Sequence, residues 1–538
     1  MESLSESATI RNSVIYRLYP KSFFDFDGDG IGDIKGITAK LSYFLSLGVD
    51  VISISSVFET DSDEITFNTT DFMRVNPALG TLRDFEELLE EAHKLQLKIY
   101  LSFPISFTST AHPWFEKSRA STSLNPYREY YIWHAGKGKS APDNKRSSFK
   151  SPLWTYDDKS GEWYRCYNGS NTPQLNFDNP RVRKEILDVL RFWREKGVDG
   201  FIVENAFFTT DKLILDNRTL LYKADEGFFA EGRGLYRMLR DIKERVESDF
   251  PLLLDPENVH PGLYPYLLTN EKPIVDALYA TDLIKDDRLF QKGSFSFKDF
   301  VKAYLSTQST DLSDKTCLPF DGKDYSRLLS NLISQTNPAF IPAAKMLCAL
   351  LFTARSVPSI YQGEEIGMTD YAPFKANDAK GYTMAPDLLH SRSPFQWDNN
   401  PNAAFTDCDY PFFLVNDNYH KINLLSQYVD GESIFSFYRK MIEMRKTSSA
   451  LRNGEFIDRS EGNVLCFLRE SKTERLLIVA NASHKSLNAK LPANLVGQSA
   501  LCEICNYGVV SKTLNATMGL RPYEVRVFRL SSPLLALN

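Results

Sequence analysis

Short runs of β-branched and aromatic residues alternate with helix-patterned segments along most of this chain, and this alternation constrains the fold most strongly. The expected strands are residues 13–16, 49–54, 98–101, 200–203 and 359–361. Strands that alternate with helices favour a parallel sheet whose faces are covered. A length of 538 residues is enough for two or three domains.

Two of the expected helices begin with recognisable caps. One starts after Thr81, which together with Asp84 makes a start close to a capping box. The other starts at Pro180 after Asn179, and Gly197 ends it. Both helices carry an apolar stripe at a spacing of three and four residues and lead directly into the next expected strand, which is the pattern of a parallel α/β protein.

The alternating pattern breaks in two places. Between about 108 and 172 the chain is rich in Ser, Gly, Lys, Asn and Trp and shows little periodicity, which indicates an inserted segment. After about 451 strand-like runs replace the helices, for example 476–479 and 525–528, which suggests a C-terminal β-domain.

Charge and hydropathy exclude two classes of partner. Lys and Arg number 63 against 69 Asp and Glu, a net charge of -6, and no basic run could displace counterions from phosphates, so no nucleic-acid partner is expected. The N-terminus lacks the basic start and apolar stretch of a signal peptide, and the most apolar run, 343–354, is shorter than the ~20 residues of a spanning helix. We therefore expect a soluble chain without a membrane-spanning segment, cytoplasmic unless the N-terminus is incomplete.

Residues 25–33 read DFDGDGIGD. Carboxylates at positions 1, 3, 5 and 9, with a Gly at position 6, have the spacing of oxygen ligands that wrap Ca²⁺. Four aspartates this close together repel one another without a cation. The alternative is a plain Asp/Gly turn.

Five stretches carry a family resemblance: IYRLYPKSFFDFDGDGIGDIKGI, TDFMRVNPALGTLRDFEELLEEAHKLQLKIYL, NFDNPRVRKEILDVLRFWREKGVDGF, IYQGEEIGM and SRSPFQWDNNPNAAF. They resemble the α-amylase family of glycoside hydrolases, in its α-glucosidase and oligo-1,6-glucosidase branch, over nearly the whole chain. Heavy-chain ectodomains of heteromeric amino-acid transporters share this barrel, and EYYIWHAGKGK is similar to theirs.

The resemblance implies an α/β fold, a (β/α)8 TIM barrel with an inserted domain B and a C-terminal antiparallel β-domain. The implied division is barrel domain A at 1–107 and 173–450, domain B at 108–172 and the β-domain at 451–538. It also implies that the Asp-rich loop is a structural Ca²⁺ site. Its ligands would be Asp25, Asp27, Asp29, the Ile31 carbonyl and Asp33.

The catalytic positions are implied in the same way. The family pattern Gly-Phe-Arg-x-Asp, whose Asp is the nucleophile, corresponds here to Gly200-Phe201-Ile202-Val203-Glu204. Glu257 is the best-fitting general acid, although the alignment could slip to Asp255. Asp324 matches the transition-state stabiliser, and Arg327 matches an arginine that we assign to substrate binding.

Five of seven catalytic positions depart from the family pattern: Ser102, Phe107, Ile202, Glu204 and Lys323. The extra methylene of Glu204 shifts its carboxylate by about 1 Å, and a misplacement of that size can cost ~100-fold in rate. Loss of the arginine at Ile202 favours the neutral form of a partly buried carboxylate. Phe107, in place of a hydrogen-bonding imidazole, is expected to fill the old sugar subsite.

Three functions follow from these departures. The first is an α-glucosidase-like protein that has lost hydrolase activity and acts as a non-catalytic scaffold or like a transporter heavy chain, with a saccharide or a membrane-transporter light chain as partner. The absence of a membrane helix and of any Cys before Cys166 argues against a true heavy chain. The second is a retaining α-glucosidase with residual or altered activity in carbohydrate metabolism. The third is a saccharide-binding module that stacks sugars on Trp154, Trp163 and Tyr164, for which ordinary packing is the alternative.

Overall fold

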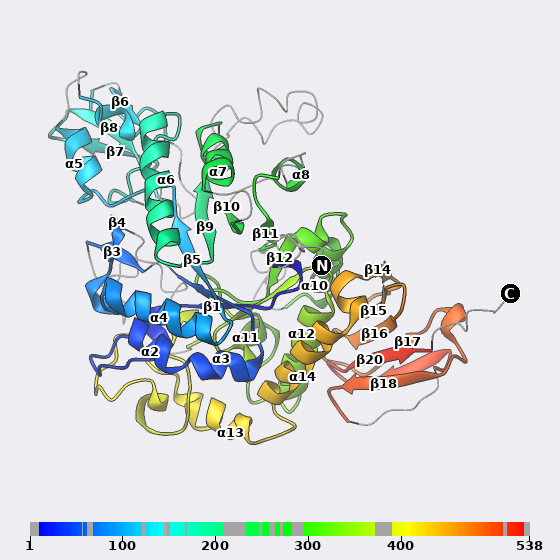
Figure 1. Ribbon diagram of the computed structural model, residues 1–538. Coiled ribbons are helices and arrows are strands. Elements are labelled where there is room, and N and C mark those ends of the chain that lie inside the picture. The colour runs from blue at the N-terminus through cyan, green and yellow to red at the C-terminus, as the bar shows by residue number, and fades with distance from the viewer. Residues whose placement is uncertain are drawn as a thin grey trace.

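The computed structural model of the chain describes residues 10–55, 57–61, 68–120, 125–136, 138–144, 146, 151–166, 169–207, 233–246, 250–257, 264–269, 273–281, 295–371, 390–508 and 514–531. Eight parallel strands close into a barrel in the order β1, β13, β12, β11, β10, β9, β5, β2 (Figure 1). Their bounds are β1 Ile15–Leu18, β2 Val51–Ile54, β5 Lys98–Pro104, β9 Gly200–Phe207, β10 Leu252–Glu257, β11 Ala277–Tyr279, β12 Thr316–Pro319 and β13 Val357–Tyr361. The predicted TIM barrel is confirmed.

Side chains of alternate strand residues fill the inside of the barrel. Ile15, Ile202 and Leu253 belong to one buried cluster that the barrel encloses. Two residues further along their strands come Arg17, Glu204 and Asp255, which the same alternation directs inward at the carboxyl ends of the strands. β1 starts at Ile15, two residues later than predicted, so Arg17 is a strand residue of the barrel and not part of the following loop.

Helices surround the barrel, and the two predicted caps are confirmed. Helix α4, Leu82–Lys94, begins with a reciprocal capping box between Thr81 and Asp84. Helix α6, Pro180–Glu195, is capped by the Asn179 side chain. The longer remaining helices are α7 Arg233–Arg245, α10 Phe297–Gln308, α12 Phe340–Thr353 and α14 Ile434–Thr447. The shorter ones around the barrel are α2 Ile34–Ala39, α3 Leu41–Leu47, α8 Tyr264–Leu268, α11 Leu328–Leu332, α13 Leu424–Tyr428 and α15 Ser449–Asn453.

The most apolar run of the sequence forms helix α12, which is buried along most of its length against β13, α14 and the C-terminal sheet. Within the residues that the structure describes, no helix combines the length and the apolar character needed to cross a lipid bilayer.

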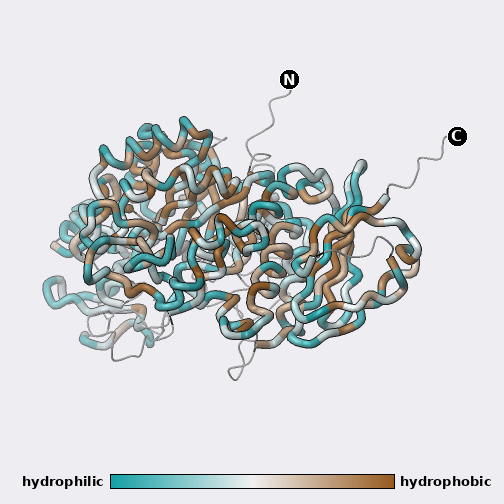
Figure 2. The backbone as a smooth tube through the Cα atoms, turned by 90° about the horizontal axis from the view of Figure 1, so that it is seen from below, coloured by the Kyte–Doolittle hydropathy of each residue, from teal (hydrophilic) through white to brown (hydrophobic). Residues whose placement is uncertain are grey.

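Two further units are attached to the barrel. Between β5 and β9 the chain forms α5, Pro113–Arg119, and a small antiparallel sheet of β6 Trp133–His134, β8 Glu162–Arg165 and β7 Trp154–Asp157. This insert lies at one end of the molecule, and the C-terminal sheet lies at the other (Figure 1). In Figure 2, hydrophobic stretches run through the interior of the barrel and along the strands of the C-terminal sheet.

The predicted C-terminal antiparallel β-domain is confirmed. Its five-stranded sheet has the order β14, β15, β16, β20, β18, and β17 pairs with β19 in a second sheet. The bounds are β14 Glu455–Asp458, β15 Val464–Glu470, β16 Arg475–Asn481, β17 Leu487–Lys490, β18 Ala500–Cys505, β19 Thr517–Leu520 and β20 Val525–Leu530. The division points between domains stay predictions.

Candidate active site

Glu204 lies in the carboxyl-terminal half of β9, three residues before the strand ends, and is 4% exposed. Lys323, from the loop after β12, donates a hydrogen bond of 3.0 Å from Nζ to Oε2 of Glu204. The expectation that the loss of the arginine at Ile202 leaves this carboxylate without a cation is therefore wrong. An ammonium group from the other side of the barrel takes that role, so the charged form of Glu204 has a direct partner.

Lys323 also contacts the second predicted catalytic carboxylate. Its Nζ lies 3.1 Å from Oδ2 of Asp324, and Arg392 pairs with Oδ1 of the same residue. Burial alone would lower the pKa of Lys323, but the charges of Asp324 and Glu204 outweigh it and raise that pKa. Burial likewise would raise the pKa of Asp324, but Lys323 and Arg392 lower it well below its ordinary value. Lys323 is therefore charged, and so is Asp324.

A second ion pair lies in the same part of the barrel. Arg17 Nη2 of β1 is 3.3 Å from Oδ2 of Asp255 on β10, and the Arg17 guanidinium also stacks over the Tyr279 ring at 4.8 Å. Burial would lower the pKa of Arg17, but the nearby anionic groups, with Asp255 first, raise it. Asp255 therefore faces the site. Glu257, the predicted acid, ends β10, and its side chain lies outside the described residues.

The site therefore pairs three carboxylates with three cations. Glu204 and Asp324 share Lys323, Asp324 also binds Arg392, and Asp255 binds Arg17. A retaining glycosidase uses its carboxylates to stabilise a positively charged, oxocarbenium-like transition state. Here that negative charge is already balanced by the protein's own side chains.

Arg327 does not face the site. Its side chain has no exposed surface and donates to the backbone carbonyls of Gln362 and Ser391, at 2.9 and 3.2 Å, while its guanidinium pairs with Asp321 at 3.5 Å. These contacts give Arg327 a structural role, and its predicted role in substrate binding stays a prediction. Because the Asp321 carboxylate also accepts the backbone N–H of Leu328, Arg327 and Asp321 together fix the loop that carries Lys323 and Asp324.

Phe107 follows β5 and is buried, with a backbone bridge to Gln174. Its burial fits the prediction that it fills the space of an older sugar subsite. Ser102, on β5, is 2% exposed and lies beside Ile202 of β9 in the barrel register.

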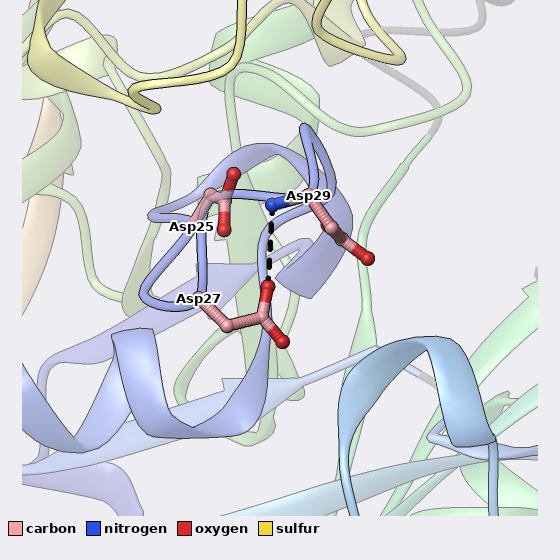
Figure 3. Close-up of side chains that lie close together, drawn as sticks. All are labelled: Asp25, Asp27 and Asp29. Atoms are coloured by element: carbon pink, nitrogen blue, oxygen red, sulfur yellow. Dashed lines mark hydrogen bonds between the residues drawn. The ribbon is translucent and has the colours of Figure 1, made fainter.

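The Asp-rich loop brings three carboxylates together. One ligand oxygen from each of Asp25, Asp27 and Asp29 lies within 4.8 Å of the others. Figure 3 shows the three side chains on their shared loop. Asp25 is buried and its oxygens accept the backbone N–H groups of Gly28 and Gly30 at 2.7 and 2.8 Å. Three hard oxygen donors so arranged fit a Ca²⁺ ion.

Asp33 has a different role in this loop. Its side chain caps helix α2, accepting from Gly36 N at 2.6 Å and from Phe26 N at 2.7 Å. Asp33 is therefore a helix cap that closes the loop and lies outside the group of three carboxylates, and its role as a fourth Asp ligand stays a prediction. The N–H of Ile31 donates to Asp29, and the role of the Ile31 carbonyl as a ligand stays a prediction.

The aromatic residues of the insert are packed. Tyr164 is 4% exposed and lies edge-on to Phe115, with ring centroids 5.0 Å apart. Trp163 donates from Nε1 to the Gly138 carbonyl, and the Gly136 backbone lies so close that a Cβ there would meet its ring at 2.6 Å. These contacts favour packing over sugar stacking for Trp163 and Tyr164.

Sequence reasoning missed Arg17, Arg392 and Tyr279 as members of the site. Arg17 lies two residues after Ile15, so the alternation of side chains along a strand directs it into the barrel. The predicted strand ended at residue 16, and for that reason Arg17 was not recognised. Arg392 lies in the quoted stretch SRSPFQWDNNPNAAF. It comes from the segment after β13, and only the closed barrel brings it beside Asp324.

Two family descriptions match the chain. Residues 17–454 match the catalytic domain of α-amylase, and residues 455–527 match the C-terminal domain of maltogenic amylase. The oligo-1,6-glucosidase of Parageobacillus thermoglucosidasius is 30% identical over 568 residues, covering 97% of this chain and 99% of that protein. The trehalose-6-phosphate hydrolase of Bacillus subtilis (strain 168) is 30% identical over 560 residues, covering 97% and 98%.

Solved structures agree in fold. The trehalose-6-phosphate hydrolase of Bacillus licheniformis superposes with a TM-score of 0.86 at 27% identity, covering 97% of this chain and 100% of that one. An isomaltulose synthase from Protaminobacter rubrum gives a TM-score of 0.85 at 30% identity, covering 97% and 99%. The chain belongs to the α-amylase family of glycoside hydrolases, in the branch of the oligo-1,6-glucosidases and trehalose-6-phosphate hydrolases.

Proposed function

We propose that the protein is a retaining α-glucosidase of carbohydrate metabolism with altered, residual activity on small α-glucosides. The observation that carries the proposal is the buried Glu204 carboxylate in the carboxyl-terminal half of β9, held by a cation at 3.0 Å. The similarity to oligo-1,6-glucosidases and trehalose-6-phosphate hydrolases over nearly the whole chain supports the substrate class.

In this mechanism Glu204 attacks the anomeric carbon, and the bond to the leaving oxygen breaks as a proton passes to that oxygen. Asp255 is engaged in the ion pair with Arg17, so Glu257 remains the proposed proton donor. Asp324 stabilises the cationic transition state. Water then releases glucose from Glu204, and Glu257, now a base, accepts the proton of that water.

Two features reduce the rate. Glu204 carries its carboxylate about 1 Å further from the strand than an aspartate does. Lys323 and Arg392 together offset the charges of Glu204 and Asp324, so less negative charge is left to stabilise an oxocarbenium-like transition state.

The test is hydrolysis of p-nitrophenyl α-glucoside by the intact protein and by Glu204→Gln, with Glu185→Gln on helix α6 as the control. We expect slow turnover that Glu204→Gln abolishes and the control preserves. A fluorinated α-glucoside that traps the intermediate should add its mass to the peptide that contains Glu204. Turnover that survives Glu204→Gln would refute the proposed nucleophile.

A second candidate is the non-catalytic role, as a saccharide-binding scaffold or as a relative of the transporter heavy chains. The specific observation in its favour is that Glu204, Asp255 and Asp324 are all bound by the protein's own cations. It becomes the better account if the wild-type protein shows neither turnover nor labelling of Glu204.

We also propose a structural Ca²⁺ ion bound by Asp25, Asp27 and Asp29, with further oxygens from the same loop. The grouping of the three carboxylates supports this site. An ion that binds only the folded state raises its stability. Addition of Ca²⁺ to chelator-treated protein should therefore raise the melting temperature, and Asp27→Asn with Asp29→Asn should remove that rise. An unchanged melting temperature in the wild type would favour the plain turn.

A further inference from the structure

The ammonium group of Lys323 has an unusual position for a lysine in this barrel. It lies 3.0 Å from Glu204 Oε2 and 3.1 Å from Asp324 Oδ2, and its side chain is 5% exposed. It is thus within hydrogen-bonding distance of two carboxylates, that of Glu204 on β9 and that of its own chain neighbour Asp324 in the loop after β12. The loop that carries Lys323 is held in place by the ion pair of Asp321 and Arg327 and by the hydrogen bond from Leu328 N to Asp321.

Two carboxylates that converge on one point form a site for a cation. A charged amine there gains a charge-assisted hydrogen bond from each of them, and such bonds are roughly twice as strong as neutral ones. In this chain the amine is part of the protein. Any ligand that seeks the same two carboxylates must first displace it.

We propose that Lys323 is a built-in occupant of a cation subsite between Glu204 and Asp324, and that this residue excludes protonated amino-alcohols and amino-sugars from the pocket. The proposal rests on the proposed function, because that function identifies the pocket as a sugar site. Lys323 is thus a specificity-determining residue. It offsets one negative charge of the pair Glu204 and Asp324, and its removal frees that charge to bind a small organic cation.

Tris is a suitable probe because it is a protonated amino-alcohol at neutral pH. Pentaerythritol is its neutral counterpart, in which a fourth hydroxymethyl group replaces the ammonium. Each compound is titrated by calorimetry into the wild-type protein and into Lys323→Met, in a buffer free of amines. The control is Lys345→Met, which removes another buried lysine whose amine donates to the Glu432 carbonyl on the outside of the barrel.

The expected result is that Lys323→Met binds Tris at least about tenfold more tightly than the wild type or Lys345→Met, the factor that corresponds to a charge-assisted hydrogen bond. Pentaerythritol should bind all three proteins equally weakly. Addition of Glu204→Gln to Lys323→Met should remove the gain. Equal Tris affinity in the wild type and in Lys323→Met would overturn the proposal, and so would an equal gain for pentaerythritol.

A measurement on the wild type covers the case in which Lys323→Met does not fold. The native protein is treated with an amine-acetylating reagent, and the modified lysines are identified by peptide mass spectrometry. Lys323 should stay unmodified until the protein is unfolded, while the exposed Lys184, at 75% side-chain exposure, reacts at once. Acetylation of Lys323 at the rate of Lys184 would contradict its place between the two carboxylates.

These binding and labelling readouts do not depend on turnover. A protein that hydrolyses no α-glucoside but whose Lys323→Met variant gains Tris binding would refute the proposed function and leave this inference standing. A protein that hydrolyses α-glucosides but whose Lys323→Met variant binds Tris no more tightly would support the proposed function and refute this inference.

Discussion

Arg17 of β1 and Asp255 of β10 form an ion pair, 3.3 Å from Nη2 to Oδ2, inside the carboxyl end of the barrel. Their side chains are 11% and 16% exposed. Burial of such a pair removes both charged groups from water, which costs free energy. Removal of one partner then leaves the other charge buried without its counterion.

Asp255→Asn should therefore destabilise the protein by about 3 kcal/mol. The double variant Arg17→Met with Asp255→Leu should cost less than Asp255→Asn alone, because it leaves no buried charge behind. Urea unfolding followed by tryptophan fluorescence measures both. A double variant that is less stable than the single one would show that the pair itself stabilises the fold.

Asp321 predicts a pH dependence of stability. Burial raises the pKa of Asp321 to about 6, although Arg327 opposes that shift. The pKa of Asp321 is higher in the folded protein than in the unfolded chain. Asp321 therefore makes its full contribution to the free energy of unfolding when the pH is below its unfolded-state pKa, and this contribution is lost as the pH rises to about 6. Asp321→Asn should remove this decline, on the order of 1 to 3 kcal/mol.

Asp324 should give a pH dependence of stability opposite in direction to that of Asp321. Its pKa is lowered, so its contribution to stability is present above the unfolded value and is lost as the pH falls. Asp324→Asn should therefore flatten the acid side of the curve, and Asp321→Asn the part up to about pH 6. The same effect from both variants would contradict the two opposite shifts.

Arg469 of β15 connects the C-terminal domain to helix α12 of the barrel domain. Its guanidinium donates to the carbonyls of Thr353 and Ala354 at the end of α12, at 2.7 and 2.6 Å, and to Leu451 at 2.8 Å. Arg469→Met removes the donor to the buried carbonyls of Thr353 and Leu451, each at about 1 to 3 kcal/mol, while Ala354 keeps its second donor, Arg445. The melting temperature should drop, and proteases should release the C-terminal domain.

Arg475→Met is the matched control for that experiment. Arg475, on the neighbouring strand β16, pairs with Glu470 at 2.8 Å, and Glu470 is 34% exposed. A pair of this kind contributes about 1 kcal/mol or less. Equal protease sensitivity in the two variants would show that Arg469 does not join the domains.

Three consecutive residues, Asn402, Ala403 and Ala404, have positive φ angles of 52°, 56° and 52°. This region costs L-residues roughly 1 to 2 kcal/mol each, whereas glycine adopts it freely. Ala404→Gly should stabilise the protein by ~0.5 to 1 kcal/mol after the greater freedom of the unfolded glycine is subtracted. Ala92→Gly in helix α4 should instead cost ~1 kcal/mol or more. A loss of stability on Ala404→Gly would contradict the strain.

The alternation of strands and helices was enough to predict the parallel sheet, and the resemblance gave the closed barrel. The caps at Thr81 and Asn179 followed from local hydrogen bonding, which the sequence encodes directly. The placement of Glu204 in the carboxyl-terminal half of its strand was also accessible. Its cationic partner was not, because Lys323 lies 119 residues away in the chain and only barrel closure brings it near.

The contacts of Arg327 and Asp33 could not be predicted for a different reason. A match to a family position gives the residue type but not the direction of its side chain. Arg327 donates to buried carbonyls and Asp33 caps α2, and both contacts depend on loops whose conformation has no periodic signature.

The most direct test of this account compares kcat/KM for p-nitrophenyl α-glucoside between the wild type and the triple variant Ile202→Arg, Glu204→Asp, Lys323→His. The variant restores the family's nucleophile, its arginine and its imidazole. We predict slow turnover in the wild type and an increase of at least ~100-fold in the folded triple variant. A folded triple variant that is no faster than the wild type would contradict the claim that these three side chains limit the reaction.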